Sequence, residues 1–129
     1  MNSYVVDASA WLEYFEGTEK GALVKSLLEG AATKLYTSAF TLAELRSVAE
    51  RRNKSYVGKI YEMVTKLSVV SDLTVILSLQ AGSIHAMARA KIKDFPMGDA
   101  VVVSLARSMD CRIISTDTHF KLFAEAIVF

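Results

Sequence analysis

Cysteine, proline and glycine are all scarce in this sequence of 129 residues, which has one cysteine, one proline and six glycines. A single cysteine cannot form an intrachain disulfide, so we interpret Cys111 as a small buried thiol in a reducing compartment. With so little proline and glycine there is no linker or low-complexity segment, and we expect one domain over residues 1–129. No glycine-rich phosphate loop is present, which excludes nucleotide binding of that kind.

Long hydrophobic runs are also missing. The longest stretch without a charged residue, 73–88, contains Gln80 and is shorter than the about 20 apolar residues that span a bilayer. Acidic residues interrupt the N-terminal segment at Asp7, Glu13 and Glu16, so no secretory signal is visible. We therefore expect a cytoplasmic protein with no membrane partner.

An excess of charge of one sign is absent as well. The formal net charge is +1, so no global basic field indicates nucleic acid. Apolar residues, in contrast, make up 52% of the sequence, with a mean hydropathy of +0.29, which excludes a disordered chain. This surplus predicts a homodimer or larger assembly, and we expect its interface on the outer faces of 40–52 and 56–69, including Tyr56, Ile60 and Met63.

Short apolar runs alternate with helical patterns along the whole sequence. Strands are predicted at residues 4–6, 35–37, 74–77, 112–115 and 126–128. Helices are predicted between residues 8 and 30, and at 40–52, 56–69, 79–92 and 99–109. Strands separated by helices require right-handed crossovers, so we predict an α/β fold with a mostly parallel central sheet that helices cover on both faces.

Acidic residues stand at four places where packing alone does not explain them: Asp7, Glu44, Asp99 and Asp117. The first and the last follow short buried strands, and the carboxyl ends of parallel strands meet at one edge of a sheet. The other two lie on apolar faces of predicted helices. Acids that converge without basic partners repel one another, which indicates a bound cation. Ligands that are all oxygen favour Mg²⁺ or Mn²⁺ over zinc, and we assign neither histidine to the metal.

Each acid also has a purely structural interpretation. Asp7 could cap the helix that follows it, and Asp117 could be a turn residue after a strand. Thr41 and Glu44 match the spacing of a capping box, in which the glutamate bonds back to the first amide of the helix. Asp99 lies in the first turn of a helix, where the helix dipole stabilises an acid. One metal site explains all four acids together, whereas the structural interpretation needs four separate reasons.

Ser9, two residues after Asp7, distinguishes the site from those of other α/β enzymes. A phosphatase of the haloacid-dehalogenase type needs a second acid at that position, and this sequence has a serine there. The hydroxyl of Ser9 could orient Asp7, or the residue could simply start a helix.

Four short motifs follow one another in a fixed order: Asp7-Ala8-Ser9, Thr41-Leu42-Ala43-Glu44-Leu45, Gly98-Asp99-Ala100 and Ser115-Thr116-Asp117-Thr118-His119-Phe120. Their order and spacing resemble the PIN domain and, within it, the toxin ribonucleases of the VapC type, over essentially the whole chain.

This resemblance implies a Rossmann-like, three-layer α/β/α sandwich in which the four acids bind Mg²⁺ or Mn²⁺ and hydrolyse RNA. Ser9 and Ser115 would stand beside these ligands. The resemblance also implies homodimers, and a toxin–antitoxin pair in which a small antitoxin protein blocks the acidic pocket. A non-catalytic module of the same fold that binds RNA or a protein is the alternative.

Basic residues gather in two runs, one over residues 46–54 and one over residues 89–93. From these runs we take Arg46, Arg89 and Lys91 as candidate RNA contacts. The alternative is that each run is only a solvated helix face.

Overall fold

All five strands of the central sheet run parallel, in the spatial order β3-β2-β1-β4-β5. The computed structural model describes residues 2–129. Its strands are β1 (Asn2–Val6), β2 (Thr33–Ser38), β3 (Val69–Ser71), β4 (Arg112–Ser115) and β5 (Ala126–Val128). Four of these five lie where the sequence predicts them, and the prediction of a parallel sheet is confirmed.

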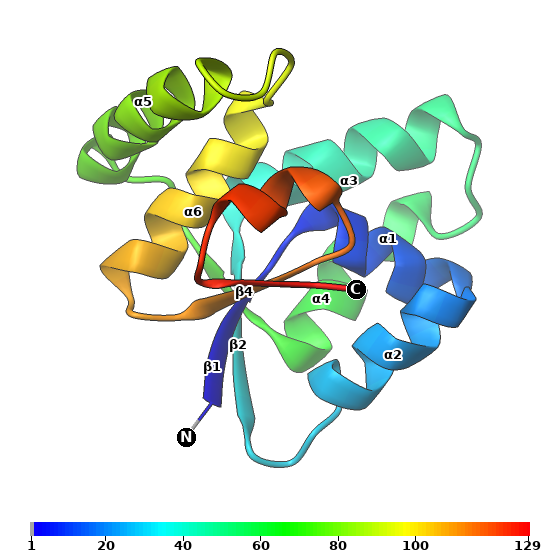
Figure 1. The fold of residues 1–129 in the computed structure, drawn as a ribbon. Helices are drawn as coiled ribbons and strands as arrows, with labels where there is room; N and C mark the ends of the chain where they lie inside the picture. The colour runs from blue at the N-terminus through cyan, green and yellow to red at the C-terminus, as the bar shows by residue number, and fades with distance from the viewer. Residues whose placement is uncertain (1) are drawn as a thin grey trace.

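Helices cover both faces of this sheet and complete a three-layer α/β/α sandwich (Figure 1). They are α1 (Ala8–Glu16), α2 (Glu19–Leu28), α3 (Ala39–Arg51), α4 (Ile60–Leu67), α5 (Val75–Arg89) and α6 (Met97–Ser108). Two 3₁₀ turns, η1 (Val57–Lys59) and η2 (Thr118–Leu122), connect them to their neighbours. The predicted layers are therefore confirmed.

Alternation along β1 shows how the sheet separates two hydrophobic cores. Val5 faces the core that α5 and α6 cover, while Tyr4 and Val6 face the core of α1, α2, α3 and α4. The same alternation divides Ile113 from Ile114 in β4. Side chains of a strand point to opposite faces in turn, so consecutive apolar residues at Tyr4–Val6 and at Ile113–Ile114 reflect the burial of both faces of the sheet there.

The predicted strand at 74–77 is wrong, because this segment starts α5. Thr74 caps that helix by accepting a hydrogen bond from the backbone N–H of Leu77, and Val75 and Ile76 are exposed. The missing strand is β3, three residues at the sheet edge, whose first residue, Val69, was predicted to end the helix at 56–69 and whose other two were assigned to no element. Apolar β-branched residues favour strands in isolation, but here a capping threonine decides the local structure.

The surface expected for self-association is also wrong in part. Ile60 is only 5% exposed and belongs to the core beneath α4, so it cannot face a second copy. Tyr61 of α4 is exposed, and a further set of exposed apolar side chains lies on α5, a helix that packs mainly on α6 at the outside of the molecule (Figure 1). None of the helices within residues 2–129 is both long and apolar enough to cross a membrane.

The order of the strands places a topological switch point at the carboxyl edge of the sheet, between β1 and β4. From β1 the chain continues through α1 and α2 to β2 on one side, whereas β4 pairs with β1 on the other side. Loops leave the carboxyl ends of β1 and β4 in opposite directions at this switch point, which is where open α/β sheets bind ligands. Asp7 and Asp117 lie at these two carboxyl ends.

Candidate metal centre

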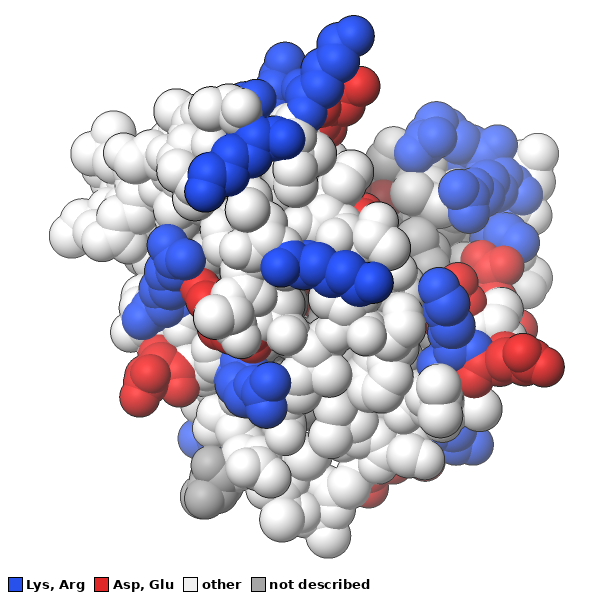
Figure 2. Space-filling model, in the orientation of Figure 1, with Lys and Arg blue, Asp and Glu red and all other residues white. Residues whose placement is uncertain are grey.

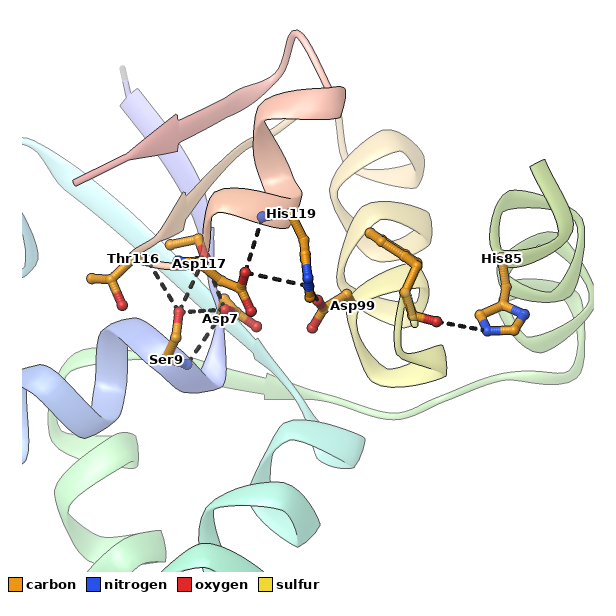
Figure 3. Close-up of polar contacts among 9 residues, drawn as sticks. Asp7, Ser9, His85, Asp99, Thr116, Asp117 and His119 are labelled. Carbon is orange, nitrogen blue, oxygen red and sulfur yellow. Dashed lines mark hydrogen bonds and ion pairs between the residues drawn. The ribbon is translucent and has the colours of Figure 1, made fainter. Parts of the chain in front are cut away.

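All four acids proposed from the sequence meet at this edge of the sheet. Asp7 follows β1, Asp117 follows Thr116 at the end of β4, Glu44 projects from α3, and Asp99 lies in the first turn of α6. Figure 3 shows the carboxylates of Asp7, Asp99 and Asp117 turned toward one another. Burial is the main cause that raises the pKa of Asp99, and the charges of the other three acids raise it further, so all four lie within range of one another's charge.

Hydrogen bonds hold the part of the site that the two strands contribute. The hydroxyls of Ser9 and Ser115 both donate to Oδ2 of Asp7, at 2.6 and 3.0 Å. Each hydroxyl also accepts a backbone N–H, Ser9 from Thr116 at 3.0 Å and Ser115 from Asp117 at 2.9 Å. These bonds cross between the ends of β1 and β4, so they fix the position of Asp7 relative to Asp117 (Figure 3).

Asp7 is a helix cap and also a buried acid of the site. Its carboxylate caps α1 by accepting the backbone N–H of Ser9 at 3.3 Å. The side chain is nevertheless only 3% exposed, and burial raises the pKa of Asp7 while the bonds from Ser9 and Ser115 oppose that rise. A cap alone does not require this degree of burial, since most caps lie at the surface of a helix end.

The two acids from helices have no comparable support. Oε1 of Glu44 and Oδ2 of Asp99 are buried and have no hydrogen-bond partner. Desolvation is the main cause that raises the pKa of Glu44 to about 7 and that of Asp99 to about 8, and nearby carboxylates add to it. A buried carboxylate without donors is costly, so its presence indicates that another group satisfies it.

The capping-box interpretation of Glu44 is wrong. Helix α3 begins at Ala39, and its capping residue is Ser38, whose hydroxyl accepts the backbone N–H of Phe40. Thr41 lies inside the helix, fully buried, with no partner for its own hydroxyl. Glu44 is thus more than one turn from the start of the helix, and its carboxylate is free to face the site.

Gly98 makes room for Glu44, a role that the sequence analysis did not assign. A Cβ atom at position 98 would lie 2.7 Å from Cδ of Glu44 and closer still to Oε2. Glycine therefore lets the carboxylate from α3 lie directly against the start of α6, next to Asp99. The sequence signal was the pair Gly98-Asp99, but the need for a residue without a side chain only becomes visible once α3 and α6 are placed together.

His119 is a second site residue that sequence reasoning missed. Its ring Nδ1 is 3.3 Å from Oδ1 of Asp117 and 3.7 Å from Oδ2 of Asp99, and its backbone N–H donates to Asp117 at 2.9 Å. One ligand atom from each of these three residues lies within 4.8 Å of the others. The imidazole projects from η2 between the two acids (Figure 3). His85, by contrast, donates to the backbone oxygen of Phe95 outside the site.

The residues present fit a hard divalent cation. Carboxylates at four positions, Asp7 and Asp99 buried and Glu44 and Asp117 half-buried, supply the oxygen ligands that Mg²⁺ and Mn²⁺ prefer, and one buried oxygen each of Glu44 and Asp99 has no hydrogen-bond partner. Within residues 2–129, no lysine or arginine forms an ion pair with any of these acids. A cation would therefore supply the positive charge that the protein itself does not.

The predicted RNA contacts differ in where they lie. Arg46 forms an ion pair with Glu50 and lies about 200° around α3 from Glu44, so the fold does not bring it to the acids. Arg89 is the last residue of α5, and Lys91 follows it in the connection to α6. Figure 2 shows a hollow in the surface with acidic atoms inside it and basic side chains on two sides, over the connection from α5 to α6 and over the end of α3.

Comparisons with known proteins agree with this geometry. A family model described as the PIN domain matches residues 4–126. Comparison with curated proteins gave no match. Among solved structures, VapC20 of Mycobacterium tuberculosis, described as a toxin that cleaves the sarcin-ricin loop, is 20% identical with a TM-score of 0.76, over 95% of this chain and 97% of that one.

Two further solved structures contain toxin–antitoxin complexes. VapBC2 of Rickettsia felis, bound to a DNA fragment of its promoter, is 14% identical with a TM-score of 0.74, over 98% of this chain and 97% of that one. DNA-bound VapBC of Salmonella typhimurium is 17% identical with a TM-score of 0.72, over 100% of this chain and 98% of that one. At such identities these likenesses show the fold.

Proposed function

Since this chain belongs to the PIN domain family, we propose that it is a Mg²⁺- or Mn²⁺-dependent ribonuclease that hydrolyses phosphodiester bonds in RNA. The observation that supports this most directly is a pair of buried carboxylate oxygens, Oε1 of Glu44 and Oδ2 of Asp99, that have no hydrogen-bond partner. A scaffold that only bound RNA would gain nothing from carrying unpaired negative charge at its binding surface.

Asp7, Glu44, Asp99 and Asp117 would hold the cation, with His119 beside the last two. A bound divalent ion supplies Lewis-acid stabilisation of the charge on the phosphate, at a site that would otherwise repel it. Ser9 and Ser115 keep Asp7 in one orientation through the bonds described above. Gly98 keeps Glu44 within reach of Asp99. Positioning of this kind is a large part of what such a site contributes to the rate.

Single-stranded or loop RNA is the substrate that the site fits best. Acidic atoms lie inside the hollow of Figure 2, and an exposed backbone phosphate enters a hollow more easily than one held in a rigid duplex. Arg89 and Lys91 lie near the basic side of the hollow formed by the connection from α5 to α6, and we propose them as backbone contacts. VapC20, the solved toxin named above, is likewise described as cleaving a loop, the sarcin-ricin loop.

A small cognate antitoxin is the protein partner we propose, with this chain as the toxin of the pair in the cytoplasm. The support is that the similar solved structures include toxin–antitoxin complexes from several bacteria. An antitoxin would block the acidic pocket and so keep RNA away from the four acids.

We also propose a homodimer, formed through α5. Val75 and Leu79 are 77% and 71% exposed, and Ile76 and Met87 are exposed on the same helix. A helix of 15 residues is about 22 Å long, enough to provide much of the roughly 800 Å² per partner of a standard interface. Light scattering at tens of micromolar should show a dimer, and the double change Val75→Asp with Leu79→Asp should give a folded monomer.

Cleavage of a single-stranded RNA in the presence of Mn²⁺, and its loss with EDTA, tests the ribonuclease. The alternative, a module that binds RNA or a protein without cleaving, predicts binding in both conditions and no products in either. Asp99→Asn should remove cleavage while circular dichroism shows an unchanged fold. RNA that remains intact with Mn²⁺ at micromolar protein would refute the proposal.

A further inference from the structure

A groove next to the acids, on one side of α3, has features that the metal centre does not use. Its volume is about 340 Å³, and it is lined by Phe40, Ala43, Glu44, Ser47, Val48 and Arg51. We call it the α3 groove. Because Glu44 lines this groove and also belongs to the four acids, the groove opens directly from the proposed cleavage site.

An aromatic side chain lies on the α3 groove immediately beside the acids. Phe40 is 36% exposed, and it precedes Glu44 by four residues, so the two side chains share one face of the helix. Val48 continues that face one turn beyond Glu44 and adds apolar surface. The ring is therefore a flat apolar platform one helical turn from the proposed metal ligand, and nucleobases stack on platforms of this kind.

A cation lies at the other end of the α3 groove. Arg51 is seven residues after Glu44 and returns to nearly the same face of the helix. Its Nε donates to the hydroxyl of Ser47 at 3.3 Å, which turns the guanidinium back along the helix toward Glu44. Within residues 2–129, Arg51 forms no ion pair with a carboxylate, so its charge is available to a phosphate.

We propose that the α3 groove binds the nucleotide that adjoins the scissile phosphate, with its base stacked on Phe40 and its backbone phosphate held by Arg51. This inference rests on the ribonuclease proposed above and adds the position and the residues of one nucleotide subsite. It follows from the order of the groups along α3: an aromatic ring, the metal-side acid and then an unpaired cation. A single RNA strand presents a matching sequence of flat bases and anionic phosphates.

The opposite side of α3 offers an internal control. There, a second groove of about 190 Å³ is lined by Leu42, Arg46, Val57, Gly58, Ile60 and Tyr61. It also has an exposed aromatic ring, Tyr61 at 66%, and an arginine, Arg46. Arg46 is paired with Glu50, however, and no residue of the acidic site lines this groove. Each test change in the α3 groove thus has a chemical match that lies away from the acids.

The first experiment compares Phe40→Ala with Tyr61→Ala in cleavage of a single-stranded RNA oligonucleotide with Mn²⁺. Loss of one stacked base should lower kcat/KM about 5- to 100-fold in the Phe40 variant. Phe40→Trp should restore most of it, because a larger ring still stacks. Tyr61→Ala should stay within about twofold of the parent, as surface changes away from a site do. Thermal melts of all three variants check that the fold is kept.

An abasic scan identifies the nucleotide. Oligonucleotides that lack one base at a time, on either side of the cleaved bond, are cut by the parent and by Phe40→Ala. At one position next to the cleaved bond, removing the base should slow the parent but have almost no further effect on the variant. At every other position the two effects should multiply, since independent changes are additive in free energy.

Arg51→Gln and Arg46→Gln test the phosphate contact. The first should reduce the slope of log kcat/KM against log salt by about one, and the second should leave the slope unchanged. Equal losses in both variants would indicate only a diffuse effect of charge, and the subsite would then be rejected.

The outcomes separate this inference from the function on which it rests. If the parent cuts no RNA with Mn²⁺, the ribonuclease and the subsite fail together. If the parent cuts RNA and Phe40→Ala cuts every abasic oligonucleotide at the rate of the parent, the ribonuclease is supported and the subsite is rejected. A third outcome is that Phe40→Ala cuts RNA as fast as the parent but is inhibited less by a protein partner such as the proposed antitoxin. The α3 groove would then bind that protein, and the subsite would be rejected.

Discussion

The acidic centre consists of two parts that differ in how they are stabilised. In the part from the strands, Asp7 receives two serine hydroxyls and a backbone N–H, and Asp117 receives the N–H of His119. In the part from the helices, Glu44 and Asp99 have buried oxygens that no donor reaches. Both parts contain buried carboxylates, yet only one of them is complete without a ligand.

The acids of a metal site must be held in a fixed position and must also attract the cation, and here each part serves one of these roles. Hydrogen bonds hold the strand part in position whether or not an ion is bound, so it acts as a fixed reference. The helix part has surplus negative charge, so a cation stabilises it and the absence of a cation destabilises it. Changes in the helix part should therefore alter metal binding more than stability, and changes in the strand part should lower both.

Asp99→Asn should have the largest effect on activity. It removes a charge that the cation needs, so cleavage with Mn²⁺ should fall by roughly 10²–10³-fold or more. Without metal the variant should be at least as stable as the parent, because the amide relieves the repulsion from Asp7, Asp117 and Glu44. The rise in Tm that saturating Mn²⁺ gives the parent should mostly disappear.

Thermal melts with EDTA and with Mn²⁺ measure both effects on stability. Asp94→Asn, at an exposed position just before α6, is the matched control and should behave like the parent. An undiminished Mn²⁺ shift in the Asp99 variant would show that Asp99 is not a ligand.

Gly98→Ala should be next in size. The new methyl group would overlap the carboxylate of Glu44, and because that carboxylate ends a flexible side chain, it can swing out of the site while the fold remains. A ligand displaced by about 1 Å is expected to reduce cleavage about 100-fold, as positional errors at reacting centres do.

Gly58→Ala in η1 is the control for this change, since a Cβ there meets nothing within 4 Å. It should keep full activity and the stability of the parent. Equal activity in the two alanine variants would mean that Gly98 does not position Glu44.

Ser115→Ala tests the strand part. It removes the donor to Asp7 and the acceptor for the backbone N–H of Asp117, so activity should fall about 10- to 100-fold, as it does when groups behind metal ligands are lost. Stability should also fall by about 1–3 kcal/mol because a buried group loses its partner. Ser104→Ala, which removes a buried serine bonded to the backbone of Leu77, should cost stability but not activity. If both serine variants lose activity equally, the strand part has no special role.

The smallest effect should be the response of the metal-free protein to pH. Folding raises the pKa of Glu44 from 4.5 to about 7 and that of Asp99 from 3.8 to about 8, so the folded state binds more protons between these limits. By linkage, stability is greatest below about pH 4 for these groups and decreases as the pH rises toward 8. We expect Tm to fall by roughly a few degrees over this range in EDTA.

Saturating Mn²⁺ should flatten this dependence, because the ion replaces the protons. Melts of the parent and of Glu44→Gln across the range measure it. The glutamine variant should lose the part of the slope that Glu44 contributes, and a slope of opposite sign in the parent would contradict the buried, unpaired state of these acids.

The strands that carry the site could be predicted because their pattern is local. A short apolar run followed by an acid, as at Asp7 and Asp117, can be recognised from a few neighbouring residues alone. The convergence of these acids with Glu44 and Asp99 followed from the parallel sheet and from the family resemblance, and the structure brings all four together. Their role as metal ligands remains a prediction.

Contacts between distant elements could not be predicted in this way. Gly98 matters only because α3 lies against the start of α6, and His119 matters only because η2 turns its ring toward Asp99. The start of α5 was misassigned because Val75 and Ile76 favour a strand locally, and nothing in the local pattern shows that they remain exposed on a helix.

The pairing of β1 with β4 also has a consequence during translation. Ser115 bonds to Asp7 across 108 residues of sequence, and Asp117 comes from the same late segment. A ribosome makes the N-terminal part first, so a nascent chain that stops before β4 has neither Ser115 nor two of the side chains at the proposed metal site, Asp117 and His119. The proposed site is therefore complete only after residues 112–119 have been translated, and no shorter nascent chain contains it.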